Sequence, residues 1–314
     1  MPPLPEPGFP ELSLTIKDLD HSAVELLYRL VGNPKNILKE GIVECLRGLY
    51  GQRYPAPNII KVSVTFRSFP GVAYTSGSPH NPFSSKEIHF SLDHINNTFN
   101  NFKGSKEEKE KRTRDEIRGV LTHELVHGFQ WDGKGSCPGG LIEGIADFIR
   151  LKASLAPPHW NRSTARPSDP SKGKWDAGYE KTAYFLDWID RKYSRASTTN
   201  APPPPYSTRP EPSKPTPSLL PGQSGIDQTC HPEQGQSQSH FRPGYTPVYI
   251  APLQMPLPVA VPPQIAGGPE NVNIVQKLNA WLRDREYDQK RIWVDVTGKK
   301  VNELWTEYCN DKYW

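Results

Sequence analysis

The residues with the clearest chemical potential lie between positions 123 and 127, which read HELVH. On a helix, His123 and His127 lie one turn apart on the same face, where both imidazoles can ligate one zinc ion. Glu124 lies beside them, in position to take a proton from a metal-bound water. A motif of five residues also occurs by chance, and the two histidines would then belong to an ordinary amphipathic helix.

A third ligand is available on the next predicted helix. A catalytic zinc site takes three protein ligands and keeps one position open. The segment GLIEGIADFIRL places Glu143 and Asp147 four residues apart. We predict that Glu143 is the third ligand and that Asp147 accepts the free N–H of a ligating histidine. Simple solvation of both acids is the alternative, but unpaired acids are costly among Ile, Ala and Phe. Asp147 itself and Asp132, at the end of the motif helix, are further candidate ligands.

The motif helix has the apolar stripe that it needs for packing. Four residues at helical spacing form this stripe: Ile117, Leu121, Leu125 and Phe129. The histidines then point toward an adjacent face, at a cleft. Around this helix, apolar periodicity and turn residues predict strands at 12–16 and 60–66, and helices at 23–31, 37–49, 141–154 and 181–193. A turn-rich stretch is expected at 70–82.

Residues 86–94 alternate between apolar and polar side chains, which predicts a strand with one wet face. We expect it to lie at a sheet edge or a cleft, and a peptide could pair along such an edge strand through its main chain. After residue 269, the pattern predicts a helix at 272–282, a strand through Ile292, Val294 and Val296, and a final helix at 301–308.

Composition divides the chain into two kinds of sequence. The segment 196–268 holds 17 of the 34 prolines, with many Ser, Gln and Gly residues. Such a segment buries too little apolar surface to offset its ordering entropy, so we interpret it as a low-complexity insertion. Residues 10–195 and 269–314 are predicted to form one catalytic domain. The net charge of +4 is too small to indicate a nucleic-acid or membrane partner, and we expect a monomer.

The four cysteines form no CxxC pair, and free thiols are the simplest interpretation of Cys45, Cys137, Cys230 and Cys309. Two disulfides would be the alternative, although nothing selects a pairing. The N-terminus has no basic region followed by an apolar run. We therefore expect a cytoplasmic protein, or one that is secreted by a route without a visible signal peptide.

Longer segments extend the match beyond the motif. LTHELVHGFQWDGKG, GGLIEGIADFIRLKASLAPPHW and KWDAGYEKTAYFLDWI, with LNAWLRDREY and VTGKKVNELWTEY in the tail, resemble the plant and bacterial basic secretory protein family, a group of zinc peptidases. The resemblance covers about residues 10–195 and 270–314. It implies an α+β, zincin-like metallopeptidase fold with a mixed sheet, an active-site helix and a C-terminal helical part.

The pair Glu143 and Asp147 is also similar to the glutamate and aspartate of thermolysin-like enzymes. That similarity implies the ligand role for Glu143 and the orienting role for Asp147. The Pro-rich insertion departs from the compact family pattern, as does the absence of a leader.

These observations predict a Zn²⁺-dependent peptidase that acts on peptides or proteins with Glu124 as the general base. Tyr179 is the first candidate for stabilising the oxyanion and His159 the second, with core packing as the structural alternative for Tyr179. The main rival is a catalytically weak or inactive binding or defence protein on a zincin scaffold. A zinc hydrolase of non-peptide amides is a further alternative.

Overall fold

The computed structural model describes residues 9–51, 53–78, 81–194 and 272–314, which belong to one compact unit of the chain. The Pro-rich segment 196–268 lies outside the described residues, so the predicted domain boundaries remain a prediction. Within the described part, no helix combines the length and the apolar character that crossing a membrane requires.

The sheet has four strands in the order β1-β2-β4-β3. They are β1 (Glu11–Ile16), β2 (Lys61–Arg67), β3 (Ala73–Ser78) and β4 (Asn81–Ser91). β1 and β4 both run parallel to β2, whereas β3 runs antiparallel to β4. The predicted mixed sheet is thus confirmed, and its two edges are β1 and β3.

One face of this sheet carries the core. Val62, Val64 and Phe66 on β2 are buried, as are Ile88 and Phe90 on β4. Four helices pack near this face: α1 (Ala23–Val31), α2 (Pro34–Leu49), α3 (Leu92–Asn101) and α4 (Lys106–Phe129). Because side chains alternate along a strand, the polar residues between the buried ones face the opposite side.

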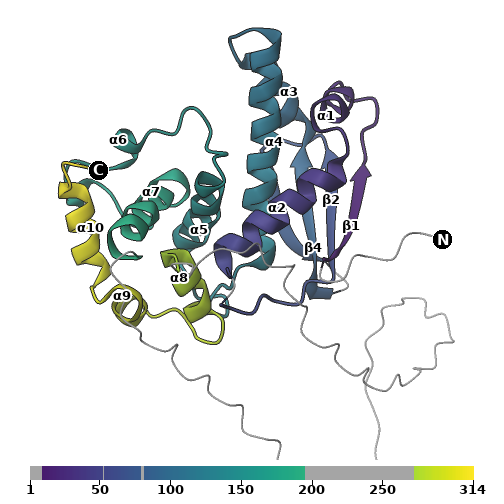
Figure 1. Ribbon diagram of the computed structural model, residues 1–314. Coiled ribbons are helices and arrows are strands. Elements are labelled where there is room, and N and C mark those ends of the chain that lie inside the picture. Colours follow the sequence, from purple (N-terminus) through teal and green to yellow (C-terminus); the bar gives the residue numbers. More distant parts are fainter. Residues whose placement is uncertain (1–8, 52, 79–80, 195–271) are drawn as a thin grey trace, which may run out of the picture. The chain divides into compact units, whose positions relative to one another are not determined.

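The remaining helices lie on the other side of α4 from the sheet (Figure 1). They are α5 (Gly139–Lys152), α6 (Arg162–Ala165), α7 (Tyr179–Ile189), α8 (Ile274–Leu282), α9 (Gln289–Thr297) and α10 (Val301–Asn310), with the short helices η1 (Pro170–Lys172) and η2 (Asp190–Ser194). The tail packs back onto the earlier residues. For example, Asn279 Oδ1 accepts a hydrogen bond of 2.9 Å from the backbone N–H of Trp131.

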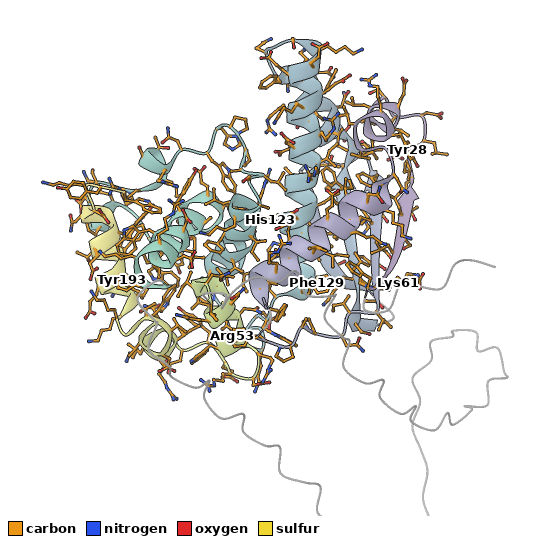
Figure 2. All side chains as sticks on the ribbon, viewed as in Figure 1. Tyr28, Arg53, Lys61, His123, Phe129 and Tyr193 are labelled. Carbon is orange, nitrogen blue, oxygen red and sulfur yellow. The ribbon has the colours of Figure 1, made fainter. Side chains whose placement is uncertain are left out.

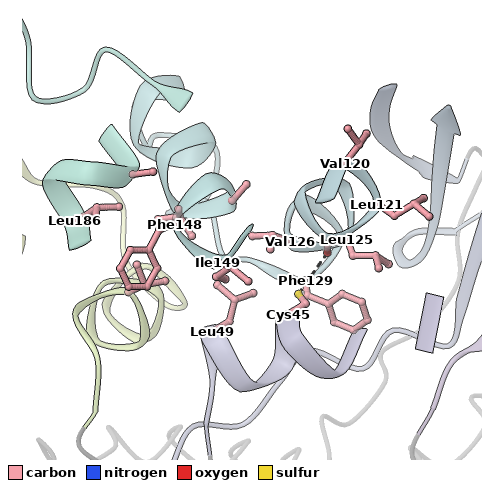
Figure 3. Close-up of a cluster of buried hydrophobic side chains, with 14 of the residues drawn as sticks. Cys45, Leu49, Val120, Leu121, Leu125, Val126, Phe129, Phe148, Ile149 and Leu186 are labelled. Atoms are coloured by element: carbon pink, nitrogen blue, oxygen red, sulfur yellow. Dashed lines mark hydrogen bonds between the residues drawn. The ribbon is translucent and has the colours of Figure 1, made fainter. Parts of the chain in front are cut away.

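Figure 3 shows apolar side chains gathered where α2, α4 and α5 meet. Two glycines of α2 permit this close packing. A Cβ at Gly41 would lie 2.6 Å from Leu125 Cδ1, and one at Gly48 would lie 2.8 Å from Ile149 Cγ1. The Sγ of Cys45 lies 3.6 Å from the Leu125 carbonyl oxygen. The buried contacts therefore hold α4 firmly against its neighbours.

Among the described residues, Cys45, Cys137 and Cys309 are free thiols, while Cys230 lies outside the described part.

The structure corrects the predicted strand at 86–94. The strand ends at Ser91, and Leu92 begins α3. The reason is a helix cap, since Ser91 Oγ accepts a hydrogen bond of 3.2 Å from the backbone N–H of His94. This strand, β4, is also interior and not an edge. The edge next to it is β3, which forms within the stretch predicted to be turns.

The predicted strand through Ile292, Val294 and Val296 is wrong, because these residues belong to α9. Asp288 caps this helix by accepting a hydrogen bond from the N–H of Lys290, and Gly298 ends it in the left-handed conformation. The alternating β-branched residues of this short helix therefore gave the pattern that is typical of a strand.

Candidate metal centre

Helix α4 carries His123, Glu124 and His127, and its beginning is specified locally. Ser105 Oγ accepts a hydrogen bond from the N–H of Glu108, while the Glu108 carboxylate accepts one from the N–H of Ser105. This capping box satisfies the free donors of the first turn. The predicted stripe is confirmed, because each of its four residues is at most 3% exposed. The stripe fixes the rotation of α4 and therefore the direction of the histidines.

A short loop brings α5 back against α4. Gly133, Lys134 and Gly135 all have positive φ angles, of 63°, 57° and 80°. The left-handed conformation reverses the chain and is easiest for glycine. Asp132 Oδ1 accepts a hydrogen bond of 3.0 Å from the N–H of Gly135. Asp132 is exposed and stabilises this turn.

Three side chains meet between α4 and α5: His123, His127 and Glu143, here called the donor group. Figure 2 places His123 where the two helices face each other. The two Nε2 atoms are 3.0 Å apart. Glu143 Oε2 lies 3.1 Å from His123 Nε2 and 3.4 Å from His127 Nε2. The donor group could hold a metal ion, because its ligand atoms all lie within 4.8 Å of one another.

The spacing of these atoms fits a small tetrahedral ion. Ligand atoms that bind zinc tetrahedrally at about 2.0–2.1 Å stand roughly 3.3 Å from one another. The three observed separations, 3.0, 3.1 and 3.4 Å, bracket that value. Two imidazole nitrogens and one carboxylate oxygen are also a donor set that zinc accepts. Glu143 joins the donor group, whereas Asp132 does not.

The other ring nitrogen of each histidine has its own partner. His123 Nδ1 lies 2.6 Å from Asp147 Oδ1, and Asp147 is only 2% exposed. His127 Nδ1 lies 2.7 Å from the Gln130 side-chain nitrogen, while the Gln130 Oε1 is buried without a hydrogen-bond partner. Rotating this amide by half a turn places Oε1 where it can accept a hydrogen bond from His127 Nδ1–H. Both histidines thus turn their Nε2 atoms toward Glu143.

The charges in the donor group support one another. Burial disfavours the imidazolium of His123, but hydrogen bonds to Asp147 and Glu143 outweigh burial and raise its pKa to about 9. Burial likewise raises the pKa of Glu143, but hydrogen bonds from His123 and His127 outweigh it and bring the pKa to about 2. The carboxylate is therefore ionised at neutral pH, which is the form that ligates cations.

Glu124 is 6% exposed and has a partner from the sheet. Thr75 Oγ1, on β3, lies 2.7 Å from Glu124 Oε2 and 2.9 Å from the Glu124 carbonyl oxygen. The carboxylate of Glu124 is therefore held on the side of α4 that faces the edge strand.

Tyr179 lies next to the donor group. Its ring stacks on the His123 ring with 6.2 Å between centroids and 10° between planes, and the residue remains 59% exposed. The Glu143 charge, with burial and the charges of Asp147 and Glu124, raises the pKa of the Tyr179 hydroxyl. The hydroxyl therefore stays protonated and can donate a hydrogen bond.

The backbone at Tyr179 is strained, with a φ of 46° that bulky residues rarely adopt. The loop before Tyr179 is closely packed against the start of α5. A Cβ at Gly140 would lie 1.8 Å from the Asp176 carbonyl oxygen, so the loop passes directly over the start of α5. His159, by contrast, is exposed in the connection between α5 and α6.

The structure thus brings five predicted residues together: His123, Glu124, His127, Glu143 and Asp147, with Tyr179 beside them. Sequence analysis missed Thr75 and Gln130. Thr75 lies in a stretch without strand periodicity, and its contact depends on sheet order. Gln130 could have been found, because it follows His127 by three residues and can fold back on it.

Comparison with known proteins gives one match. The profile of a family described as peptidases of plants and bacteria matches residues 9–199, which include α4, α5 and Tyr179. The tail helices lie beyond the matched range. No curated protein and no solved structure matches the chain.

Proposed function

Because the chain belongs to the family of peptidases of plants and bacteria, we propose that it is a zinc-dependent metallopeptidase with a zincin-like fold. One observation carries this proposal. Two histidine nitrogens and one carboxylate oxygen converge at tetrahedral spacing, and a buried glutamate adjoins one of the histidines on the same helix. That combination matches the requirements for hydrolysis assisted by a metal ion.

In this proposal, His123, His127 and Glu143 hold the ion. Asp147 and Gln130 fix the ring orientation of the two histidines, so that both Nε2 atoms face Glu143. A bound zinc ion polarises the scissile carbonyl and makes a water molecule more acidic. Binding the ion would displace the proton that His123 carries at neutral pH, so that one carboxylate and two neutral imidazoles would ligate it.

Glu124 is the general base. Its carboxylate takes a proton from the attacking water and later delivers that proton to the leaving amine. The side chain is buried, and its rotation is limited by the contact with Thr75. A base in a fixed position loses little entropy in reaching the reactive geometry.

Tyr179 donates a hydrogen bond to the oxyanion that forms from the scissile carbonyl. Three observations support this role over core packing: its ring stacks on His123, its side chain is largely exposed, and its backbone is strained. The exposed residue His159 has no comparable placement.

The substrate is a peptide or a protein segment in extended form. β3 is an edge strand, and its Thr75 contacts Glu124. A peptide that pairs with β3 through main-chain hydrogen bonds would pass directly beside the base. This replaces the pairing that we predicted for residues 86–94. We propose a monomeric enzyme with no nucleic-acid or membrane partner.

Replacing Glu124 by glutamine tests the proposal. The E124Q variant keeps the shape of the side chain but removes the base, so casein cleavage should fall at least about 1000-fold while zinc content stays unchanged. E286Q, at an exposed glutamate, is the matched control and should remain fully active. Substantial cleavage by E124Q would overturn the mechanism. A wild-type protein that binds zinc but cleaves nothing would instead favour a binding or defence protein.

A further inference from the structure

Among the described residues, Thr75 links the sheet to the buried Glu124 of α4. It lies in the middle of β3 and pairs with Ile88 of β4, whose side chain is buried. Paired residues point to the same face of a sheet, so Thr75 faces the helices. Its neighbour Tyr74 pairs with His89 and faces the opposite side.

The hydroxyl of Thr75 has one proton and two acceptors within reach. Glu124 Oε2 lies at 2.7 Å and the Glu124 carbonyl oxygen at 2.9 Å. A carboxylate accepts more strongly than a neutral carbonyl, and its contact is also the shorter one. The proton therefore goes to Oε2, which leaves the second carboxylate oxygen of Glu124 to accept a proton from water.

We propose that Thr75 is a positioning residue that holds Glu124 in the orientation of a general base. The inference rests on the proposed metallopeptidase function. A β-branched threonine is well suited to this role, because its χ1 rotamers are few. The hydroxyl is thus fixed by the strand, and the strand fixes the carboxylate.

The same contact ties the base to the strand that we propose receives the substrate. Among the described residues, β3 pairs with a strand on one side only, and Thr75 lies in β3 with its hydroxyl on Glu124. The position of the Glu124 carboxylate is therefore set relative to β3, the strand beside which the scissile bond would lie. The Thr75 side chain touches neither zinc nor substrate in this scheme, and its effect on the reaction passes through Glu124.

A purely structural role would look different. If the hydroxyl only satisfied the Glu124 carbonyl oxygen, its loss would lower stability without changing turnover of the folded enzyme. T75V removes the hydroxyl and keeps the branched shape, whereas T75S keeps the hydroxyl. T65V is the matched control, because Thr65 lies on β2 with its side chain on the opposite face of the sheet.

The test measures kcat, KM and zinc affinity of the four proteins, together with crystal structures of zinc-loaded wild type and T75V. For T75V we expect kcat to fall about 10- to 100-fold, as a small misplacement of a catalytic group does. KM and zinc affinity should stay within about twofold. T75S should recover most of the turnover, and T65V should match the wild type. The Glu124 carboxylate should occupy a different rotamer in T75V.

An unchanged kcat in T75V with Glu124 in its wild-type rotamer would overturn the proposal, as would T75S losing as much turnover as T75V. A wild-type protein without peptidase activity would contradict the proposed function alone. The Glu124 rotamer in the T75V crystal structure would then still decide whether Thr75 positions this side chain.

Discussion

Helices α4 and α5 face each other across two polar clusters that lie about two turns apart. One is the donor group, with Glu143 between two histidines. The other, here called the Glu116 cluster, consists of Glu116, His94, Arg112 and Arg150. Glu116 Oε2 lies 2.7 Å from Arg150 Nη2 and 2.9 Å from Arg112 Nη1, and Oε1 lies 3.0 Å from His94 Nε2.

The same kind of acid therefore has two different kinds of partner on one pair of helices. In the Glu116 cluster two arginines that are always charged neutralise the carboxylate, and its side chain is only 9% exposed. In the donor group the partners are histidines, which can give up their protons, and the Glu143 side chain is 29% exposed. A site for a cation needs an acid without a permanent positive partner.

A glycine allows the arginine to reach its partner. A Cβ at Gly119 would lie 2.6 Å from Arg150 Nε and 2.9 Å from the Leu155 carbonyl oxygen. Arg150 can thus cross the surface of α4 and bind Glu116. In the described part of the chain, the ion-pair partners of Glu143 are His123 and His127.

The largest expected effect is the loss of stability when Arg150 is replaced. R150M leaves Glu116 buried with half of its neutralising charge gone, and we expect it to lower the free energy of unfolding by about 3–5 kcal/mol. Zinc affinity of the folded fraction should be unchanged. E143Q should do the reverse, abolishing zinc binding while costing less stability than R150M with chelator present.

Urea unfolding and zinc titration of both variants check these effects. R291M, at an exposed arginine, serves as the control for R150M. If R150M and E143Q showed the same loss of stability and the same loss of zinc affinity, the proposed difference between the two clusters would be wrong.

The second largest effect is expected at low pH, where the Glu116 cluster should lose its contribution to stability. Burial raises the pKa of Glu116, but the His94 hydrogen bond and the charges of Arg150 and Arg112 outweigh it and lower the pKa from 4.5 to about 2. Because the folded-state pKa is the lower one, this cluster stabilises the fold above pH 4.5 and loses that contribution as the pH falls through 2. The contribution amounts to about 3 kcal/mol.

Urea unfolding between about pH 7 and about pH 2 should show this loss in the wild type. E116Q should be less stable at neutral pH and should lose less on acidification, whereas E25Q, at an exposed glutamate, should follow the wild type. If E116Q lost as much stability on acidification as the wild type, other carboxylates would account for the acid sensitivity.

The smallest effect concerns Gln130. Q130L removes the acceptor for His127 Nδ1–H, and loss of such an orienting group typically weakens metal binding by about 10- to 100-fold. Q130E keeps an acceptor oxygen at the same place and should bind zinc at least as tightly as the wild type. Competition with a chelator measures both, and Q289L at an exposed glutamine is the control. Tight binding by Q130L would show that His127 needs no partner.

Local signals predicted a large part of the fold. Apolar residues at helical spacing predicted α1 at the observed bounds and the buried stripe of α4. Residue spacing alone suggested Glu143 and Asp147, because a short loop forces the two helices together. The same reasoning failed at Ile292, Val294 and Val296, where helix caps outweigh alternation.

Non-local features escaped prediction. β3 reads AYTSGS, which has no aliphatic period, and it becomes a strand only because β4 pairs with it. The contact between Thr75 and Glu124 follows from that pairing and spans 49 positions. Likewise, nothing near Glu116 in the sequence shows that Arg150, 34 positions away, neutralises it.

The tight reversal after α4 has a consequence for the order in which the protein assembles. All three residues of the donor group lie on two consecutive helices joined by that loop, so they can meet as soon as a helical hairpin forms. The contact between Thr75 and Glu124 forms only when the distant edge strand β3 packs against α4. In the metallopeptidase that we propose, the donor group would therefore form before Glu124 gains its partner on the sheet, so that ion capture would precede peptide cleavage.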